Sequence, residues 1–341
     1  MKKTRLGRTE LMVTRTSFGA LPIQRVSFDK AKKLLVKAYD SGINFFDTAR
    51  GYTDSEEKIG YALTEVRKKI IIATKSFSQD RKTLLEHLET SLKKLKTDYV
   101  DILQLHNPGE LPDPDDPEST YAGLLEAKKK GMIRFIGITN HRINTAMEAV
   151  ASGLYDTMQF PLSSLSSDAD LELIEQCKKY DVGLIAMKAM SGGLITNAAS
   201  TFAFLRQYKN VVPIWGIQRE SELDEFLSME EQPPVLDESL WKVINKDREE
   251  LAGNFCRGCG YCMPCPVGIE IPMQARISLL LRRAPYQQFL HDEFKKKMDL
   301  IPECIECGNC RDHCPYKIDT PNLLKREIEN YNEFYRTHMQ A

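Results

Sequence analysis

The sequence predicts an α/β protein in which a (β/α)₈ TIM barrel occupies residues 1–234 and a small helical domain occupies residues 235–341. Short apolar runs and amphipathic stretches alternate eight times before residue 230, which is the repeat of a closed parallel barrel. A proline-containing linker, EEQPPVLDE, ends this alternation. Beyond the linker the pattern is helical, and eight of the nine cysteines lie within residues 256–314. We therefore expect a barrel followed by a cysteine-rich helical domain.

Eight runs rich in β-branched and aromatic residues are the predicted barrel strands. They are residues 13–19, 43–47, 70–75, 99–106, 133–140, 157–160, 182–188 and 211–216. An open doubly wound sheet is the alternative architecture. That fold carries a GxGxxG motif after an early strand, and the sequence contains none, so the barrel is the preferred interpretation.

Composition excludes several classes of function. The chain has 42% hydrophobic and 28% charged residues and a formal net charge of −1, which is the profile of a globular protein without a field suited to nucleic acid. The longest apolar runs are too short to cross a bilayer, and the N-terminus lacks the apolar core of a signal peptide. We expect a cytoplasmic protein that binds neither nucleic acid nor membrane.

Most of the apolar runs end on a polar side chain that could take part in a reaction. These residues are Asp47, Lys75, His106, Asn140, Gln159 and Lys188. In a barrel the C-terminal ends of the strands meet on one face, where active sites are built. The alternative, that polar residues only mark the junction of strand and loop, explains less well why so many are Asp, Lys, His, Asn and Gln.

Four of the residues near strand ends form a plausible set for reducing a carbonyl group. Tyr52, in the loop after Asp47, is a weak acid whose phenolate the Lys75 ammonium would stabilise, while Asp47 holds the lysine charged and oriented. His106 would bind the carbonyl oxygen as negative charge develops on it. The set needs a hydride donor beside it.

The cysteines form two similar cassettes, CRGCGYCMPCP and CIECGNCRDHCP. The second has the spacing C-x₂-C-x₂-C-x₃-C-P, in which three cysteines bind one [4Fe–4S] cluster and the fourth binds its neighbour. Cross-ligation then assigns Cys256, Cys259, Cys262 and Cys314 to one cluster, and Cys304, Cys307, Cys310 and Cys265 to the other. Two structural zinc sites are the alternative, and a single cluster is another. The third evenly spaced cysteine and the trailing Cys-Pro favour iron–sulfur.

The chain also resembles known families. The stretches GINFFDTARGYTDSEEKIGYAL, IIIATKS, DYVDILQLHNP, IRFIGITNH and YDTMQFPLS, over roughly residues 3–230, are similar to the aldo-keto reductases. The resemblance implies that Asp47, Tyr52, Lys75 and His106 are the catalytic tetrad of a nicotinamide-dependent oxidoreductase. It further implies that three residues contact the nicotinamide carboxamide: Thr139, Asn140 and Gln159. The alternative role of these three is strand-end hydrogen bonding.

Several residues in the part of the barrel that the resemblance assigns to cofactor binding depart from the family pattern. Met187 replaces the aromatic ring that stacks on nicotinamide, and Lys188 after it is either a site contact or a rim charge. In WGIQRESELDEF, Gly216 and Glu225 fit the pattern. The resemblance places Glu222 where a basic residue holds the 2′-phosphate and Phe226 where an asparagine meets adenine, and Arg219 is the candidate to supply the missing charge. NADP, NAD and no nicotinamide all remain open.

The cassette region resembles the helical two-cluster ferredoxin domains, and such a tail marks a subgroup of aldo-keto reductases. A cluster passes single electrons while nicotinamide exchanges hydride, so a flavin, an electron-transfer protein or a radical-tolerant substrate would mediate between them. The leading hypothesis is a carbonyl-reducing oxidoreductase with a nicotinamide hydride donor and a small-molecule substrate. A ferredoxin-driven reductase with weak or no nicotinamide binding is the alternative, and a non-enzymatic docking subunit is the third.

Overall fold

The computed structural model describes residues 1–251, 255–283 and 286–339. The chain divides into two compact units, and each consists of two segments of the sequence. Unit 1 comprises Met1–Ala189 and Ala198–Trp241, and unit 2 comprises Met190–Asn197 and Lys242–Ala341. The chain passes into the C-terminal part of unit 2 between Trp241 and Lys242, inside helix α9 (Glu238–Glu250). This boundary is a few residues beyond the one expected at 234/235.

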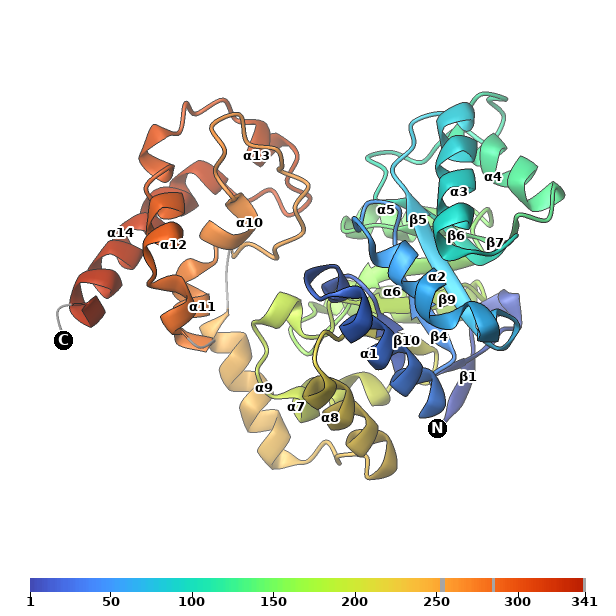
Figure 1. Ribbon diagram of the computed structural model, residues 1–341, viewed down its shortest axis with the longest axis horizontal. Coiled ribbons are helices and arrows are strands. Elements are labelled where there is room, and N and C mark those ends of the chain that lie inside the picture. Colours follow the sequence, from blue (N-terminus) through green and yellow to red (C-terminus); the bar gives the residue numbers. More distant parts are fainter. Residues whose placement is uncertain (252–254, 284–285, 340–341) are drawn as a thin grey trace. The chain divides into compact units, whose positions relative to one another are not determined.

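Unit 1 is a closed barrel of parallel strands in the order β10-β3-β4-β5-β6-β7-β8-β9, surrounded by helices (Figure 1). This confirms the predicted TIM barrel. The barrel strands are β3 (Ser17–Gly19), β4 (Phe45–Asp47), β5 (Ile71–Ser76), β6 (Val100–His106), β7 (Ile133–Thr139), β8 (Thr157–Pro161), β9 (Gly183–Met187) and β10 (Val211–Gly216). The helices are α1 (Phe28–Asp40), α2 (Ser55–Leu63), α3 (Arg81–Leu95), α4 (Thr120–Lys129), α5 (Ile143–Ala151), α6 (Asp168–Lys179), α7 (Ala198–Arg206) and α8 (Glu220–Glu231).

One predicted strand is divided in the structure. Residues 13–19 were expected to form a single strand, but β2 (Met12–Thr14) pairs antiparallel with β1 (Lys3–Arg5), and only β3 joins the barrel. Leu6, Leu11 and Val13 of this N-terminal hairpin are buried with the inward side chains of the barrel strands. The hairpin therefore closes the barrel with apolar side chains, at the end away from the strand C-termini.

Side-chain caps define where several barrel helices begin. Ser27, Asp80 and Ser119 each accept a hydrogen bond from the backbone N–H three residues later. Ser167 and Asp170 form a reciprocal capping box at the start of α6. These caps set where the helices that follow β3, β5, β6 and β8 begin.

Unit 2 is helical, as predicted for the cysteine-rich domain. In addition to part of α9, its helices are α10 (Ile271–Gln274), α11 (Ile277–Arg283), α12 (Asp292–Met298), α13 (Asn309–Asp312) and α14 (Thr320–Met339). The last helix, α14, contacts α10, α11 and α13 (red in Figure 1). The Tyr331 hydroxyl on α14 donates to the Phe289 carbonyl at 2.7 Å, and Glu327 accepts from the Ser278 N–H at 2.8 Å. These bonds fix the long helix against α11 and the turn at Tyr286–Phe289.

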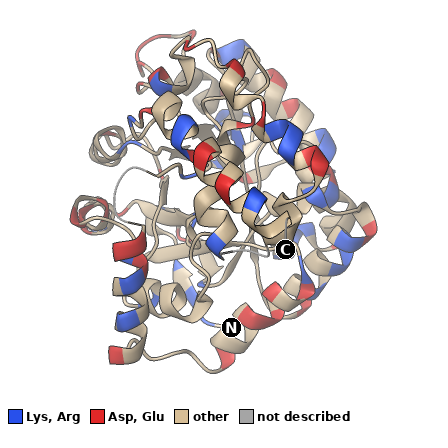
Figure 2. Cartoon of the chain, turned by 90° about the vertical axis from the view of Figure 1, so that its left-hand side faces the viewer, with Lys and Arg blue, Asp and Glu red and all other residues tan. Residues whose placement is uncertain are grey.

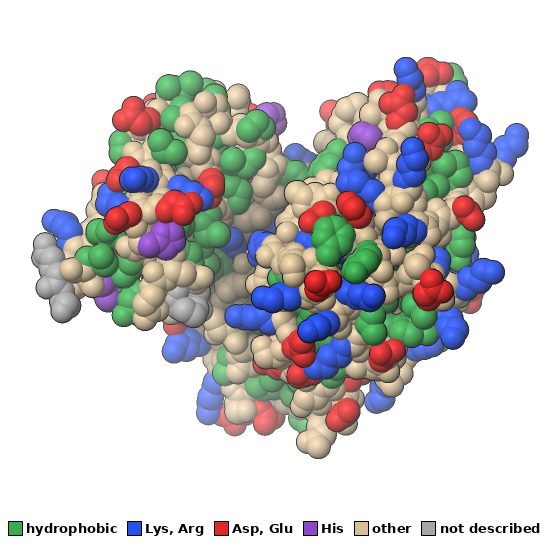
Figure 3. Space-filling model, in the orientation of Figure 1, with side chains coloured by type: hydrophobic (Ala, Val, Ile, Leu, Met, Phe, Trp, Pro, Cys, Tyr) green, Lys and Arg blue, Asp and Glu red, His purple; other side chains and the backbone are tan. Residues whose placement is uncertain are grey.

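On the face shown in Figure 3, side chains of Lys and Arg are interspersed with those of Asp and Glu. Residues of both signs also alternate along the chain in the cartoon of Figure 2, in agreement with the formal net charge of −1. Among the described helices, none combines the length and the hydropathy required of a bilayer-spanning segment.

Close packing of α2 on α3 depends on Gly60. A methyl group at this position would lie 2.3 Å from the Lys94 carbonyl oxygen, closer than atoms can approach. Gly60→Ala should therefore destabilise the protein by about 1–3 kcal/mol through overpacking, although alanine is the better helix former. Anaerobic urea unfolding followed by circular dichroism measures this change. Gly123→Ala in α4, whose new methyl would have 3.2 Å to its nearest neighbour, is the matched control with a smaller effect; equal effects would contradict this packing.

Candidate active site and cysteine cavities

A buried ion pair lies at the C-terminal end of the barrel. Asp47 is the last residue of β4, and Lys75 lies on the adjacent strand β5. The Lys75 Nζ atom is 2.6 Å from Asp47 Oδ2 and also donates to the Thr48 carbonyl oxygen at 2.6 Å. Both side chains are at most 3% exposed. Removing either partner would leave an uncompensated buried charge, so the two must be retained together.

Two glutamines connect this pair to the barrel interior. Gln104 Nε2 donates to Asp47 Oδ1 at 3.3 Å and to Gln159 Oε1 at 2.9 Å. Sequence reasoning assigned Gln159 but missed Gln104. The available signal was its position two residues before His106 on the same strand, which directs both side chains to the same face. Asp47 is thereby oriented by an amide as well as by the lysine.

Tyr52 and His106 lie beside the ion pair. Their rings meet edge to face with centroids 5.9 Å apart, and Lys75 Nζ is 5.1 Å from the centre of the Tyr52 ring. Phe77 stacks on the His106 ring at 3.9 Å and is 44% exposed. Gly51 is required beneath it, since a methyl there would lie 2.5 Å from Phe77 Cε2. The structure thus brings together the four residues predicted for carbonyl chemistry and adds an aromatic face that sequence reasoning missed.

Burial sets the protonation of these groups. Desolvation, together with the Lys75 and Lys188 charges, lowers the pKa of His106 well below 6.5, so its imidazole is neutral at pH 7. Desolvation and the Asp47 charge raise the pKa of Tyr52, so its hydroxyl keeps its proton. From the sequence, the Lys75 charge was expected to lower the pKa of Tyr52. The structure gives the opposite direction, because burial and the Asp47 charge both raise it. Desolvation likewise lowers the pKa of Lys75.

A second histidine, His141, belongs to the same environment and was not identified from the sequence as a site residue. Its imidazole is buried, and its pKa is lowered by desolvation and by the charges of Lys188 and His106. Lys188 directly follows β9, and its charge contributes to the lowered pKa of both histidines.

Thr139 and Asn140, which were expected to contact the nicotinamide carboxamide, form hydrogen bonds with the backbone of the rim loops. Thr139 Oγ1 accepts the Asn107 N–H at 3.0 Å. The Asn140 side chain donates to the Pro108 carbonyl at 3.0 Å and accepts the Arg142 N–H at 2.8 Å. Both ends of the Asn140 amide are thus engaged in backbone hydrogen bonds of this rim.

In the turn after β10, the carboxylate of Glu222 binds backbone N–H groups of the same turn. Glu222 Oε2 accepts the backbone N–H groups of Gln218 and Arg219 at 2.9 and 3.0 Å, which are the donors a phosphate would use at the start of α8. The Arg219 guanidinium is 2.6 Å from Glu222 Oε1, so its charge is offset locally. Phe226 is buried in a stack with Trp215 at 4.3 Å. This turn is poorly suited to a 2′-phosphate.

The remaining predicted cofactor residues have different environments. Met187 is buried among the inward side chains of the barrel strands. Gly216 is exposed, and a methyl on it would lie 3.1 Å from Pro22. Glu225 is exposed on α8. The structure therefore separates Met187, which belongs to the core, from Gly216 and Glu225 at the surface.

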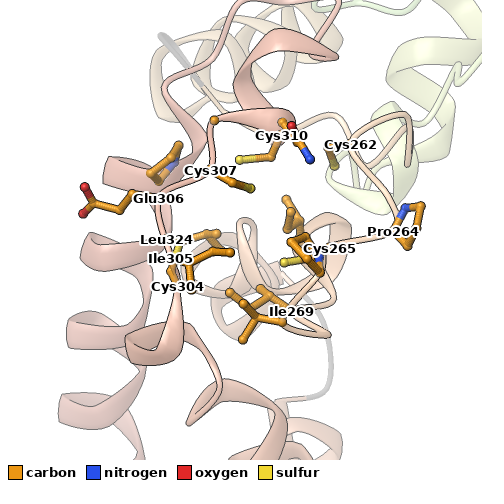
Figure 4. A pocket seen from close by; sticks show the side chains of 16 residues that line it. Cys262, Pro264, Cys265, Ile269, Cys304, Ile305, Glu306, Cys307, Cys310 and Leu324 are labelled. Carbon is orange, nitrogen blue, oxygen red and sulfur yellow. The ribbon is translucent and has the colours of Figure 1, made fainter.

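Two cavities in unit 2 are lined by the cassette cysteines. The first contains about 340 Å³ of atom-free space and is lined by the cysteines Cys256, Cys259, Cys262, Cys310 and Cys314. The second contains about 390 Å³ and is lined by the cysteines Cys262, Cys265, Cys304, Cys307 and Cys310 (Figure 4). Each cavity includes all four cysteines of one predicted cross-ligated set. Figure 4 shows that Glu306, between two of these cysteines, points away from the second cavity.

The cysteines that line these cavities are free thiols. All nine cysteines are free of disulfides, so each cassette thiol is available as a metal ligand.

The barrel, its polar rim and the cysteine cavities together define an oxidoreductase with an iron–sulfur domain, and comparison with known proteins identifies the family. Residues 15–203 match the aldo/keto reductase family and residues 255–319 match a 4Fe-4S dicluster domain. The chain therefore belongs to the aldo/keto reductase family, in the subgroup with a C-terminal 4Fe–4S domain. Membership supports an enzyme, against the docking-subunit alternative.

Individual relatives resemble the barrel part of the chain. It is 31% identical over 212 residues to the uncharacterized oxidoreductase YqkF of Bacillus subtilis, covering 58% of this chain and 67% of that protein. It is 32% identical over 213 residues to L-galactose dehydrogenase of Arabidopsis thaliana, covering 56% and 66%. An aldo-keto reductase from Klebsiella pneumoniae in complex with NADPH has the same fold, with a TM-score of 0.62 at 19% identity over 72% of this chain and 94% of that one. The matches thus span about two thirds of the length of these curated relatives.

The lowered pKa values of the two buried histidines predict that the stability of the fold depends on pH. Folding lowers the pKa values of His106 and His141, so the unfolded chain gains protons near pH 6.5 that the folded chain does not. Their contribution to stability is present above about pH 6.5 and is lost as the pH falls, by up to about 1.4 kcal/mol per group and pH unit. Urea unfolding between pH 7.5 and 5.5 measures the loss, which His141→Gln should reduce. Protonation of both imidazoles near pH 6.5, observed by NMR, would contradict the assignment.

Proposed function

We propose that the protein reduces a small carbonyl substrate at the C-terminal end of the barrel, with residues 1–234 as the catalytic domain and residues 235–341 as the electron-transfer domain. The observation that carries this proposal is the buried Lys75–Asp47 pair, at 2.6 Å, with Tyr52 and His106 beside it. Membership in the aldo/keto reductase family supports the same reaction class.

Tyr52 is the proposed acid. Its hydroxyl gives its proton to the substrate oxygen as hydride reaches the carbonyl carbon, and the neutral His106 imidazole donates a hydrogen bond to the same oxygen. The Lys75 ammonium stabilises the phenolate that Tyr52 leaves, while Asp47 and Gln104 hold Lys75 in place. Phe77 supplies an apolar face beside His106 for the substrate. Water then returns a proton to Tyr52.

A bound nicotinamide would supply the hydride. The Glu222 carboxylate, at the turn where the family resemblance places the 2′-phosphate, disfavours NADP by charge repulsion, and Arg219 is already paired with it. A free 2′-hydroxyl has no such conflict, and acidic residues accept hydrogen bonds from this group in other dinucleotide sites. We therefore propose NADH over NADPH, with Thr139, Asn140 and Gln159 nearest the carboxamide.

The cassettes are proposed to hold two [4Fe–4S] clusters. The first set of ligands is Cys256, Cys259, Cys262 and Cys314, and the second is Cys265, Cys304, Cys307 and Cys310. The grouping of each set around its own cavity supports this assignment. The clusters would exchange electrons with a partner protein, and a flavin remains the candidate mediator to hydride chemistry. The reducing cytoplasm, which keeps thiols free for iron, is the proposed location.

A second candidate function follows from the same rim. Because Glu222 occupies the donors at the start of α8 and Phe226 is buried against Trp215, the barrel is also suited to reduction without nicotinamide. Two electrons would then arrive one at a time through the clusters. Tyr52 would give one proton to the substrate oxygen while His106 contacts that oxygen, and water would supply the second proton, to the carbon.

The cluster assignment predicts the metal content. Protein purified without oxygen should be brown and contain about eight iron atoms per chain, four for each cluster. Iron and sulfide analysis with electron paramagnetic resonance of the reduced protein measures this. A colourless protein with two zinc ions would contradict the assignment, and four iron atoms would indicate the one-cluster alternative.

The acid assignment predicts the effect of removing one hydroxyl. Tyr52→Phe should lower turnover of small aldehydes and ketones by about 10²–10⁴-fold, because the proton donor is lost. Iron content and cluster absorbance should not change. Tyr61→Phe, which removes an exposed hydroxyl on α2, is the matched control and should retain turnover. Unchanged turnover in Tyr52→Phe would show that another group donates the proton.

A further inference from the structure

Among the described residues of unit 2 is a buried arginine, Arg276, whose position neither the cysteine motifs nor the family resemblance accounts for. Arg276, between α10 and α11, is 9% exposed. Its Nε donates to the Pro272 carbonyl at 2.8 Å, and its Nη1 donates to the Gly192 carbonyl at 3.1 Å. Gly192 lies in the turn Ser191–Gly193, part of the short segment after β9 that belongs to unit 2. The arginine therefore connects this segment to the cluster domain.

The guanidinium also lies against the first cassette. A methyl group on Gly258 would be 2.7 Å from Arg276 Cζ, and a methyl on Gly192 would be 3.0 Å from Nη1. Both glycines have positive φ, +61° and +68°. Gly258 stands between two predicted ligands, and its N–H is 3.3 Å from Cys256 Sγ. Two glycines thus provide the space in which a cation approaches the first cavity.

A cation at this place has a defined electrostatic effect. A cluster bound by four thiolates is an anion, and it becomes more negative when it accepts an electron. Charge, hydrogen bonds to sulfur and solvent exposure set the reduction potential of such clusters. A buried positive charge stabilises the reduced form more than the oxidised form, and the low local dielectric strengthens the effect. The guanidinium should therefore raise the potential of the nearer cluster.

We propose that Arg276 is a positioning residue that raises the reduction potential of the first cluster and couples it to the turn Ser191–Gly193. This rests on the proposed function only in assuming that the cavity holds a cluster. Gly192 lies in the short segment of unit 2 that follows β9, and its carbonyl accepts from the guanidinium that Gly258 borders. A change at this turn should therefore also change the potential of the first cluster.

Redox titration of the anaerobic full-length protein, followed by electron paramagnetic resonance, tests the proposal. Arg276→Gln should move one of two midpoint potentials to a more negative value and leave the other in place, while Arg276→Lys should move it less. Cys307→Ser alters the second cluster and identifies its signal. The signal that Arg276→Gln shifts should be that of the first cluster, which Cys307→Ser leaves unaltered.

Glycine pairs provide matched controls that retain the charge. Gly192→Ala and Gly258→Ala should shift the first midpoint in the same direction, because each new methyl displaces the guanidinium. Gly193→Ala and Gly260→Ala also introduce alanine at a positive φ, but their new methyl groups would lie in open space. These two variants should leave the first midpoint potential unchanged. Unmoved potentials in Arg276→Gln, equal shifts of both clusters, or equal effects of the paired glycines would overturn the inference. Wild-type protein without cluster signals would instead overturn the cluster assignment on which it rests.

Discussion

The barrel site depends on keeping two opposite charges out of water. Lys75 and Asp47 are almost fully buried at a separation of 2.6 Å, and neither is tolerable there alone. Adjacent parallel strands supply the two residues, so the pair forms where β4 and β5 align. The same desolvation keeps His106 neutral and Tyr52 protonated. Burial at this end of the barrel thus sets the protonation state of both side chains at neutral pH.

The second constraint is electron counting. A nicotinamide delivers two electrons as hydride, whereas an iron–sulfur cluster passes one electron at a time, so the barrel and the helical domain do not exchange electrons directly without a mediator. The Glu222 carboxylate at the start of α8 makes the choice of hydride donor unusual for this fold. Arg276 provides the structural element that links the first cassette to the chain leaving β9.

Periodic features could be predicted from the sequence, while features set by loop geometry could not. The eight barrel strands were predictable because each is a buried apolar run, and Asp47 and Lys75 because they end such runs. The division of residues 13–19 was missed because a turn inside an apolar alternation leaves no gap in the pattern. Gln104, His141 and the bonds of Glu222 to its own turn depend on side-chain directions and rim loops. The placement of Met190–Asn197 in unit 2 depends on tertiary packing alone.

The barrel is proposed to use a nicotinamide without a 2′-phosphate at the Tyr52 site. The direct test is anaerobic titration of the full-length protein with NADH and with NADPH, following cofactor fluorescence. NADH binding should be saturable and at least about tenfold tighter than NADPH binding, a difference of about 1.4 kcal/mol. Replacing Glu222 by glutamine should narrow this difference. Tighter binding of NADPH, or no saturable binding of either dinucleotide, would contradict the claim.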